Sequence, residues 1–442
     1  MTENGVYEIA PLRAQARKVK NDSYVLSTVS IDKRNEILKG IAEALMDKAD
    51  EILAANARDL KDGEAAGLPS PIMKRLVFDE KKLDGVVLGL RDLYKLPDPI
   101  GKVLLERELD EDLLLKQVTC PIGVIGVIFE SRPDALVQIA SLCLKSGNCA
   151  ILKGGSEAKH TNRILAEIIH DTGVKHGLPD GFLTLLELRS EIDELLKCSG
   201  SIDLIIPRGS NDFVRYIMDN SDIPVMGHSD GICHVYVDKA ADLEEAVKIA
   251  VDSKTQYVAA CNTAETLLVH EDVAGAFLPN LQKALLQKDV VIHATEDVRA
   301  IVGEAYGNLC EGVAGEANFK TEYSDYVINI KIVRDLEEAV QHINTYGSHH
   351  TDAIITEDGK AAEDFMNGVD SAGVYQNAST RFADGFRYGF GAEVGISTGK
   401  LHARGPVGLE GLVTYKYKLY GHGNVVDDYA EGRKSFKFKN IL

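Results

Sequence analysis

Residues 123–155 read GVIGVIFESRPDALVQIASLCLKSGNCAILKGG, and this stretch decides the fold class. Two short apolar runs, GVIGVIF and CAIL, flank a segment whose apolar residues have helical spacing. The two runs are nearly continuous rather than alternating, which is typical of parallel strands buried on both faces. The stretch therefore predicts a strand, a helix and a second parallel strand, the unit of a doubly wound α/β sheet.

The same alternation of strand and helix extends along the chain. Further apolar runs occur at LTLLEL and DLIIPRG and, after Cys233, at HVYVD, TLLVH, VVIHA, YVINIKIV, AIITED and AGVYQNAS. Helical segments separate these runs, so we expect two α/β domains in tandem. Residues 7–93 have helical spacing throughout, with Ser30 and Asp32 as candidate capping residues.

Two segments outside these domains have strand character. Residues 103–120, VLLERELDEDLLLKQVTC, predict a two-stranded hairpin that turns at ELDED. An isolated hairpin is marginally stable, so we expect this arm to pair with another domain or subunit. The tail from residue 408, GLEGLVTYKYKLYGHG, predicts an edge or pairing strand. Together they indicate a homo-oligomer, a dimer or higher.

The composition excludes several classes of partner. A formal charge of -19 over 442 residues argues against binding to nucleic acid or to an anionic membrane. No apolar run reaches the roughly 20 residues of a membrane span, and MTENGVYEIA lacks the regions of a signal peptide. The seven cysteines contain no CxxC pair, which favours reduced thiols in the cytoplasm over disulfides or a structural metal site.

Cys261 is the candidate nucleophile, within KTQYVAACNTAETLLVH at residues 254–270. A thiolate can attack an acyl carbon if donors for the developing oxyanion are close, and Asn262 offers a side-chain amide and a backbone N–H. The alternative is that Cys261 is a small buried packing residue, because free cysteine is among the most buried residue types. The local sequence alone favours this alternative.

No GxGxxG motif follows any predicted strand, so a nucleotide must be held in another way. Two strand-to-helix junctions combine a cation, a glycine and a capping side chain, where a helix N-terminus favours an anion. These junctions are Lys153, Gly154, Gly155 and Ser156, and Arg208, Gly209, Ser210 and Asn211. Either one by itself is equally consistent with an ordinary capped turn, but two in one sheet favour phosphate binding.

Several long segments together resemble the γ-glutamyl phosphate reductase family of the aldehyde dehydrogenase superfamily, over essentially the whole chain. They are ESRPD at residues 130–134, LKSGNCAILKGGSEA, IPRGS, HSDGICHVYVD, the Cys261 segment, NASTRFADGF, YGFGAEVGIST and KLHARGPVGLEGL. The resemblance implies an aldehyde-dehydrogenase-like fold and NADPH-dependent reduction of L-glutamate 5-phosphate to L-glutamate 5-semialdehyde with release of phosphate, the second step of proline biosynthesis. It also implies a stand-alone enzyme, with a separate glutamate kinase as a candidate partner.

The resemblance assigns roles residue by residue. Cys261 would form a thioester that hydride reduces, and Asn262 with backbone N–H groups would stabilise the oxyanion. The cofactor residues would be Lys153, Gly155, Ser156, Arg208, Gly209, Ser210 and Glu322. Many NAD-using relatives have a glutamate where Ser156 stands, so a serine leaves space for the 2′-phosphate of NADP.

The substrate carries a phosphate at one end and an α-carboxylate and α-amino group at the other. Its candidate ligands are Arg132, His228, Ser379, Thr380, Arg381, His402 and Arg404. An arginine fork suits carboxylate or phosphate, but each arginine is also consistent with a structural salt bridge. Glu393 would either hold the amino group or pair with one of these arginines.

His228 stands in MGHSDG, where hydrolytic aldehyde dehydrogenases have a glutamate that activates water. Its absence suits an enzyme that must keep water from a thioester. The histidine itself is either a phosphate contact or a loop residue. Val258 and Asp134 depart from the family, which often has proline and asparagine at these positions; an ionised Asp134 offers no amide to an oxyanion.

We expect residues 1–103 and 121–227 to form the NADP-binding domain and residues 228–405 the catalytic domain. Residues 104–120 and 406–442 would form the oligomerisation arm and C-terminal strand. Two rival interpretations remain. One is another acylating or hydrolytic aldehyde dehydrogenase, and the other is a non-catalytic scaffold of the same fold.

Overall fold

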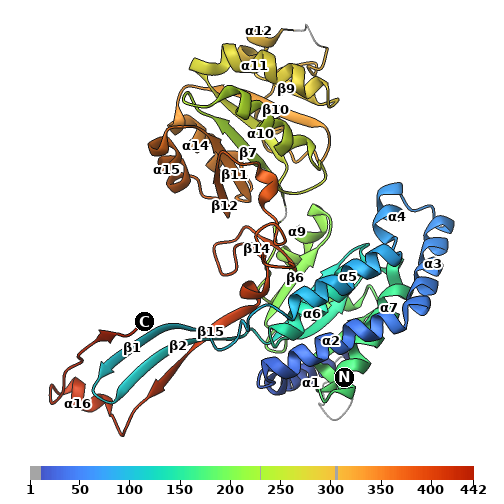
Figure 1. The fold of residues 1–442 in the computed structure, drawn as a ribbon, viewed down its shortest axis with the longest axis vertical. Helices are drawn as coiled ribbons and strands as arrows, with labels where there is room; N and C mark the ends of the chain where they lie inside the picture. The colour runs from blue at the N-terminus through green and yellow to red at the C-terminus, as the bar shows by residue number, and fades with distance from the viewer. Residues whose placement is uncertain (1–10, 229, 304–306) are drawn as a thin grey trace, which may run out of the picture. The chain divides into compact units, whose positions relative to one another are not determined.

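The computed structural model describes residues 11–228, 230–303 and 307–442 (Figure 1). Residues 7–10, where the first predicted helical stretch begins, lie outside the described residues. The chain forms two compact units. The first contains the chain up to Met226 together with Phe390–Gly395 and Val407–Leu442, and the second contains Gly227–Gly389 and Ile396–Pro406. Phe390–Gly395, which we assigned to the catalytic domain, thus belongs to the first unit.

The first unit begins with the predicted helices. They are α1 (Pro11–Leu26), α2 (Ile31–Asp47), α3 (Ala49–Ala65), α4 (Ser70–Leu76) and α5 (Glu80–Leu93). Ser30 caps α2, because its side chain accepts a hydrogen bond from the backbone N–H of Lys33. Leu38, Ile41 and Leu45 lie on the buried face of α2, which packs against α5, α6 and α7.

The strands predicted in the opening stretch and after it form a parallel four-stranded sheet in the order β5-β4-β3-β6. Every residue of β3 and β4 is buried, as expected for strands covered on both faces. The strands are β3 (Val124–Phe129), β4 (Cys149–Lys153), β5 (Leu183–Leu186) and β6 (Leu204–Arg208). The connecting helices are α6 (Pro133–Lys145), α7 (Lys159–Lys175), α8 (Glu191–Leu195) and α9 (Asn211–Asn220), with short 3-10 turns η1 (Ser156–Ala158) and η2 (Asp180–Phe182).

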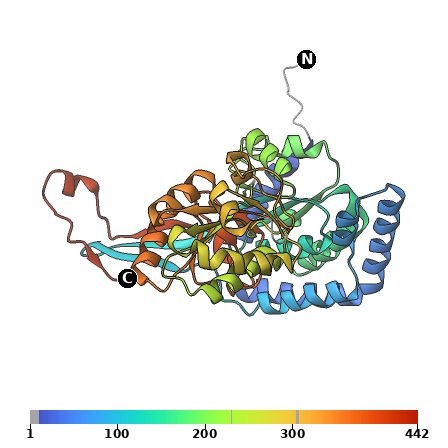
Figure 2. The same cartoon turned by 90° about the horizontal axis from the view of Figure 1, so that it is seen from above.

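The predicted hairpin is confirmed as β1 (Val103–Asp110) and β2 (Leu113–Pro121). The C-terminal strand β15 (Val413–Tyr420) pairs antiparallel with β2, and β16 (Lys439–Asn440) pairs with β1. The four strands therefore form one sheet in the order β15-β2-β1-β16, which projects from the helices of its unit (Figures 1 and 2). A turn η4 (Leu409–Leu412) precedes β15, and α16 (Val426–Ala430) lies between β15 and β16.

The second unit contains a six-stranded sheet in the order β12-β11-β7-β8-β10-β9, and every neighbouring pair is parallel. Its strands are β7 (Cys233–Val237), β8 (Ala264–His270), β9 (Val291–Ala294), β10 (Val327–Val333), β11 (Thr351–Ile355) and β12 (Gly373–Gln376). Its helices are α10 (Leu243–Thr255), α11 (Glu271–Leu286), α12 (Glu296–Val302), α13 (Glu316–Phe319), α14 (Leu336–Tyr346) and α15 (Gly359–Gly368), with a 3-10 turn η3 (Thr380–Phe382). The short strands β13 (Gly395–Ser397) and β14 (Gly405–Val407) pair where the chain passes between the units.

Hydrophobic cores on both faces show that this second sheet is also doubly wound. Val235 and Val237 of β7 pack into one core with Phe277 of α11, whereas Tyr236 between them packs into another with Phe365 of α15. Successive strand residues point to opposite faces, so a continuous apolar run supplies both cores. Among the described residues, no helix has both the length and the apolar character that a membrane span requires.

Candidate active site

Cys261 lies in the turn between α10 and β8, and its side chain is half-buried. Its Sγ is 3.2 Å from Nε2 of His350, the residue directly before β11. His350 is 1% exposed, and its Nδ1 lies 2.9 Å from the hydroxyl oxygen of Thr351. Because β11 and β8 both flank β7, the sheet brings together a thiol and an imidazole that are 89 residues apart.

His228 completes a cluster with these two side chains. Its Nδ1 lies 3.0 Å from the carbonyl oxygen of Ile396, and its ring meets that of His350 edge-on with centroids 5.1 Å apart. One ligand atom from each of His228, Cys261 and His350 lies within 4.8 Å of the other two. The sequence assigned His228 to the substrate, whereas the structure places it beside the thiol.

The main chain at Cys261 is tightly packed against Gly231. A Cβ at Gly231 would lie 2.4 Å from the Cα of Cys261, closer than atoms can approach, so this position requires glycine. Behind it, the Cys233 thiol donates a 3.3 Å hydrogen bond to the carbonyl oxygen of Cys261. Burial raises the pKa of Cys233 well above its usual value, so that thiol stays protonated and structural.

The side chain of Asn262 is engaged in a structural contact. It is 4% exposed, and its Nδ2 donates a 2.8 Å hydrogen bond to the carbonyl oxygen of Ala383. The main-chain N–H groups of Cys261 and Asn262, in contrast, have no hydrogen-bond partner among the described residues. Of the two kinds of oxyanion donor that we predicted, the Asn262 amide is therefore engaged elsewhere, whereas the main-chain N–H groups next to the thiol are not.

Among the residues of the NASTRF segment, Arg381 is the one whose charge interacts with that of the Cys261 thiol. Burial lowers the pKa of Arg381, Arg387 lowers it further, and the charge of Cys261 partly opposes both effects. Its Nε donates to the Gln256 side chain at 3.0 Å. Ser379 instead caps η3 by accepting from the N–H of Arg381, and the buried Thr380 hydroxyl has no hydrogen-bond partner within the described ranges.

The other predicted substrate ligands lie in different settings. Arg404 donates to the Asp370 carboxylate at 3.0 Å, which matches the salt-bridge alternative, and Lys400 pairs with the same carboxylate at 2.6 Å. His402 is exposed two residues before Arg404. Arg132 is exposed at the N-cap of α6 in the first unit, where no described residue bonds to its guanidinium.

A carboxylate lies against the first predicted phosphate turn. A Cβ at Gly155 would lie 2.1 Å from Glu157 Oε1, and this oxygen accepts 2.7 Å hydrogen bonds from both the N–H and the hydroxyl of Ser131. Lys153 is 4% exposed and donates to the carbonyl of Gly154. Its pKa is lowered by burial, an effect that nearby carboxylates including Glu157 oppose. Ser156 is exposed at the start of η1.

The second predicted turn also faces a carboxylate. Ser210 is the N-cap of α9, and its backbone N–H donates a 3.2 Å hydrogen bond to Glu130 Oε2. A Cβ at Gly209 would lie 2.7 Å from the same oxygen. Arg208 donates a 3.5 Å hydrogen bond to the carbonyl oxygen of Glu393. Glu130 thus occupies a main-chain donor that we assigned to a phosphate.

Glu322 lies near a buried ion pair in the second unit. Lys254 Nζ is 2.7 Å from Glu265 Oε2, and these side chains are 0% and 1% exposed. Burial raises the pKa of Glu265 to about 7 and lowers that of Lys254. The charge of Glu322 adds to the rise for Glu265 and opposes the fall for Lys254. Neither partner of this pair was identified from the sequence.

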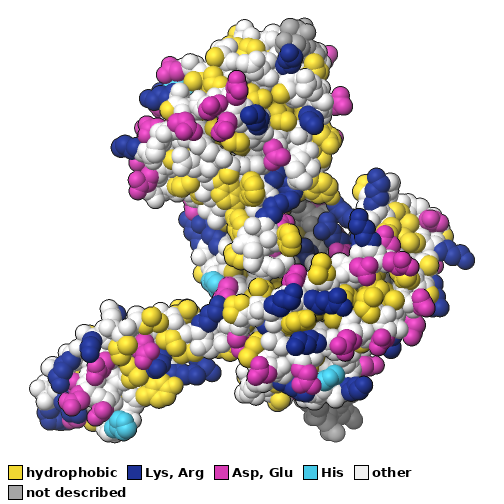
Figure 3. Space-filling view, viewed as in Figure 1, with side chains coloured by type: hydrophobic (Ala, Val, Ile, Leu, Met, Phe, Trp, Pro, Cys, Tyr) yellow, Lys and Arg dark blue, Asp and Glu magenta, His cyan; other side chains and the backbone are white. Residues whose placement is uncertain are grey.

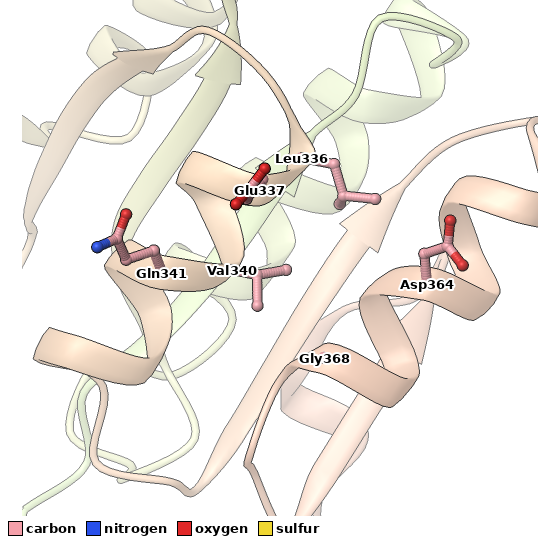
Figure 4. Close-up of a pocket in the computed structure, with 6 residues that line it drawn as sticks. All are labelled: Leu336, Glu337, Val340, Gln341, Asp364 and Gly368. Carbon is pink, nitrogen blue, oxygen red and sulfur yellow. The ribbon is translucent and has the colours of Figure 1, made fainter.

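A surface groove of about 550 Å³ lies between α14 and α15 (Figure 4). Leu336 and Val340 of α14 point toward α15 there, and Asp364 lies across from them. No residue predicted for catalysis or cofactor binding lines this groove, so we assign it no role. The face drawn in Figure 3 carries basic, acidic and hydrophobic side chains intermixed.

Comparisons of the sequence and of the fold with known proteins lead to the same family. The family model for the aldehyde dehydrogenase family matches residues 100–303. The chain is 57% identical to the gamma-glutamyl phosphate reductase of Pelotomaculum thermopropionicum over 426 residues, 96% of each chain, and 58% identical to that of Ruminiclostridium cellulolyticum over 419 residues, 95% of each. The crystal structure of gamma-glutamyl phosphate reductase from Thermotoga maritima is similar with a TM-score of 0.90, at 38% identity, covering 94% of this chain and 99% of that one.

Proposed function

The chain belongs to the γ-glutamyl phosphate reductase family of the aldehyde dehydrogenases, and from this premise we propose how its own residues carry out the reaction. The enzyme reduces L-glutamate 5-phosphate to L-glutamate 5-semialdehyde with NADPH and releases phosphate, a step of proline biosynthesis. The observation that carries the assignment of roles is the 3.2 Å contact between the Cys261 thiol and His350.

The cofactor turns of the first unit suit an anionic dinucleotide. Gly155 and Gly209 have no room for a Cβ, Lys153 supplies a cation, and the Ser210 N–H lies at the N-terminus of the ten-residue helix α9. We assign NADPH to these residues together with Arg208, Ser156 and Glu322. The exposed Ser156 leaves space for a 2′-phosphate, and Glu130 must release the Ser210 N–H when a phosphate approaches.

Cys261 is the nucleophile. His350 Nε2 takes the thiol proton, and the thiolate attacks the acyl carbon of L-glutamate 5-phosphate. The new S–C bond replaces the C–O bond to phosphate, which leaves as inorganic phosphate, and a thioester remains. When bound, NADPH supplies the hydride that reduces this thioester. The S–C bond of the resulting thiohemiacetal then breaks, which returns the thiolate and releases the aldehyde.

The negative charge on the carbonyl oxygen needs donors at the attack step. We assign this role to the main-chain N–H groups of Cys261 and Asn262, while the Asn262 side chain holds the loop against Ala383. Arg381 is the best candidate for an anionic group of the substrate, because its charge is coupled to the thiol. We keep His228, Ser379, Thr380, His402, Arg404 and Arg132 as candidate substrate ligands.

The test is phosphate-dependent reduction of NADP⁺ by L-glutamate 5-semialdehyde, run in parallel with NAD⁺ and with coenzyme A in place of phosphate. We expect turnover with phosphate and NADP⁺ and a loss of at least roughly 10⁴-fold in the Cys261→Ser variant. Cys310→Ser, a half-buried cysteine elsewhere in the second unit, is the matched control. Turnover that depends on coenzyme A would favour an acylating aldehyde dehydrogenase. Turnover that needs neither phosphate nor coenzyme A would favour a hydrolytic one, and a folded but inactive wild type would favour the non-catalytic scaffold.

We further propose a cytoplasmic enzyme that forms a dimer or higher homo-oligomer, with the glutamate kinase as a separate partner. The support for self-association is the arm sheet, in which β15 has one paired and one open edge and seven of its eight residues are exposed. An open edge strand is a site for pairing with another chain.

A further inference from the structure

The cluster of His228, Cys261 and His350 has the donor set of a zinc site. We propose that this site binds one Zn²⁺ through the Cys261 sulfur and one nitrogen of each histidine, and that the bound ion blocks the enzyme. Thiolate and imidazole are ligands that Zn²⁺ prefers, and three protein ligands with an open fourth position are a common arrangement. The inhibition rests on the proposed role of Cys261 as nucleophile, whereas the binding does not.

The distances are compatible with coordination after a small adjustment. Bonds of about 2.0–2.3 Å to a tetrahedral Zn²⁺ separate neighbouring N and S ligand atoms by roughly 3.3–3.7 Å. Cys261 Sγ and His350 Nε2 are 3.2 Å apart, and no pair in the cluster exceeds 4.8 Å. The widest pair must therefore close by at most about 1 Å.

Both histidines are held as metal ligands usually are. A zinc-bound imidazole typically uses its second nitrogen for a hydrogen bond to a carbonyl or another acceptor, which fixes its orientation. His228 Nδ1 lies 3.0 Å from the carbonyl oxygen of Ile396, and His350 Nδ1 lies 2.9 Å from the Thr351 hydroxyl. This leaves Nε2 of each ring for the ion, and in His350 that nitrogen already faces the Cys261 sulfur.

Coordination would stop catalysis by a simple exchange of bonds. The Cys261 thiol loses its proton to solvent as the Zn–S bond forms, and no oxidation or reduction takes place. The sulfur lone pair that attacks the substrate is then used by the metal, and His350 can no longer accept the thiol proton. Removal of the ion by a chelator restores both groups.

The experiment titrates the metal-free protein with Zn²⁺ and, for spectroscopy, with Co²⁺. We expect one Zn²⁺ per chain and, with Co²⁺, a sulfur-to-metal charge-transfer band that is absent from Cys261→Ser. His228→Ala should weaken Zn²⁺ binding at least tenfold. Cys310→Ser and His349→Asn are matched controls, since neither residue belongs to the cluster, and thermal melting of each variant confirms that it is folded.

Activity is measured separately from binding. We expect Zn²⁺ to inhibit turnover of the wild type at concentrations that fill the site, and EDTA to reverse this inhibition. A charge-transfer band that persists in Cys261→Ser, or equal Zn²⁺ affinity in His228→Ala and wild type, would overturn the inference while leaving the proposed function intact. If the protein bound zinc through this cluster but had no reductase activity, the zinc site would be supported and the proposed function would fail.

Discussion

At the scale of single residues, the thiol of Cys261 is distinguished by its surroundings. Burial raises the pKa of Cys143 to about 12 and that of Cys149 higher still, so those thiols remain protonated packing groups. Cys261 alone among the seven cysteines has an imidazole nitrogen at hydrogen-bond distance from its sulfur within the described part of the chain. A cysteine becomes a nucleophile through such a neighbour rather than through its own sequence position.

The first prediction concerns His350. Because it is the group that accepts the thiol proton, His350→Asn should lower kcat/KM on the order of 10²-fold, the lower end of general base contributions. Steady-state kinetics measure this effect. As a second readout, the rate at which iodoacetamide alkylates Cys261 should also fall.

His349→Asn is the matched control for this prediction. His349 is the adjacent histidine, its Nδ1 lies 2.6 Å from the carbonyl oxygen of Asp370, and its φ of 60° is one that asparagine tolerates. We expect its kcat/KM to stay near the wild-type value. If the His350 and His349 variants lost activity equally, His350 would have no special relation to the thiol.

At the scale of elements, the turns after β4 and β6 each carry a carboxylate against the glycine. Glu157 faces Gly155 and Glu130 faces Gly209, and the loop between β3 and α6 joins them, because Glu130 contacts the second turn and Ser131 binds Glu157. Ser131 has a φ of 49°, a backbone conformation that non-glycine residues adopt rarely. Carboxylates of the protein therefore lie against both turns that we propose for the cofactor phosphates.

We therefore predict that Glu130→Gln tightens NADPH binding. The substitution removes a negative charge that competes for the N-terminus of α9, and charges at such positions contribute about 0.3–1 kcal/mol, or roughly two- to fivefold in the dissociation constant. The measurement is quenching or enhancement of NADPH fluorescence on titration with enzyme.

Glu194→Gln, an exposed carboxylate on α8, changes the net charge equally and serves as the control. Its dissociation constant for NADPH should match that of the wild type. Weaker binding in Glu130→Gln would mean that this carboxylate holds the cofactor instead of competing with it.

At the scale of the whole molecule, segments from the first third and from the end of the chain build the arm. Eight registered residue pairs join β15 to β2, from Val413 and Pro121 to Tyr420 and Leu114. The exposed side chains of Tyr415, Tyr417 and Leu419 lie on this strand. The hairpin thus has a partner within the same chain, and β15 forms one edge of the resulting sheet among the described strands.

We predict that the protein is at least a dimer in solution at micromolar concentration and that this edge holds it together. Light scattering should give at least twice the mass of one chain, and Tyr417→Pro, which removes a backbone donor from the edge strand, should lower it. Tyr216→Phe, at another exposed tyrosine in the first unit, is the control. A wild type that scatters as a monomer would contradict the prediction.

The sequence by itself determined most of the elements and their order, and its resemblance to a family made Cys261 the candidate nucleophile. Apolar runs and helical spacing are local properties, so the strands from β3 to β12 and the hairpin were predictable, and the Cys261 segment was specific to its family. The first turns of α11, from Glu271, were not predictable, because proline favours the start of a helix whereas Pro279 lies inside this one.

Only the tertiary structure decided which groups surround the thiol. His350 is 89 residues from Cys261 along the chain. Position 231 must be glycine because the main chain of Cys261 packs against it in the fold. The side chain of Asn262 donates its hydrogen bond to the carbonyl of Ala383. Glu130, in the loop after β3, likewise reaches the turn after β6 only in the fold. These contacts depend on the order of strands in a sheet, and parallel pairing joins distant segments without leaving any periodic signal in the sequence.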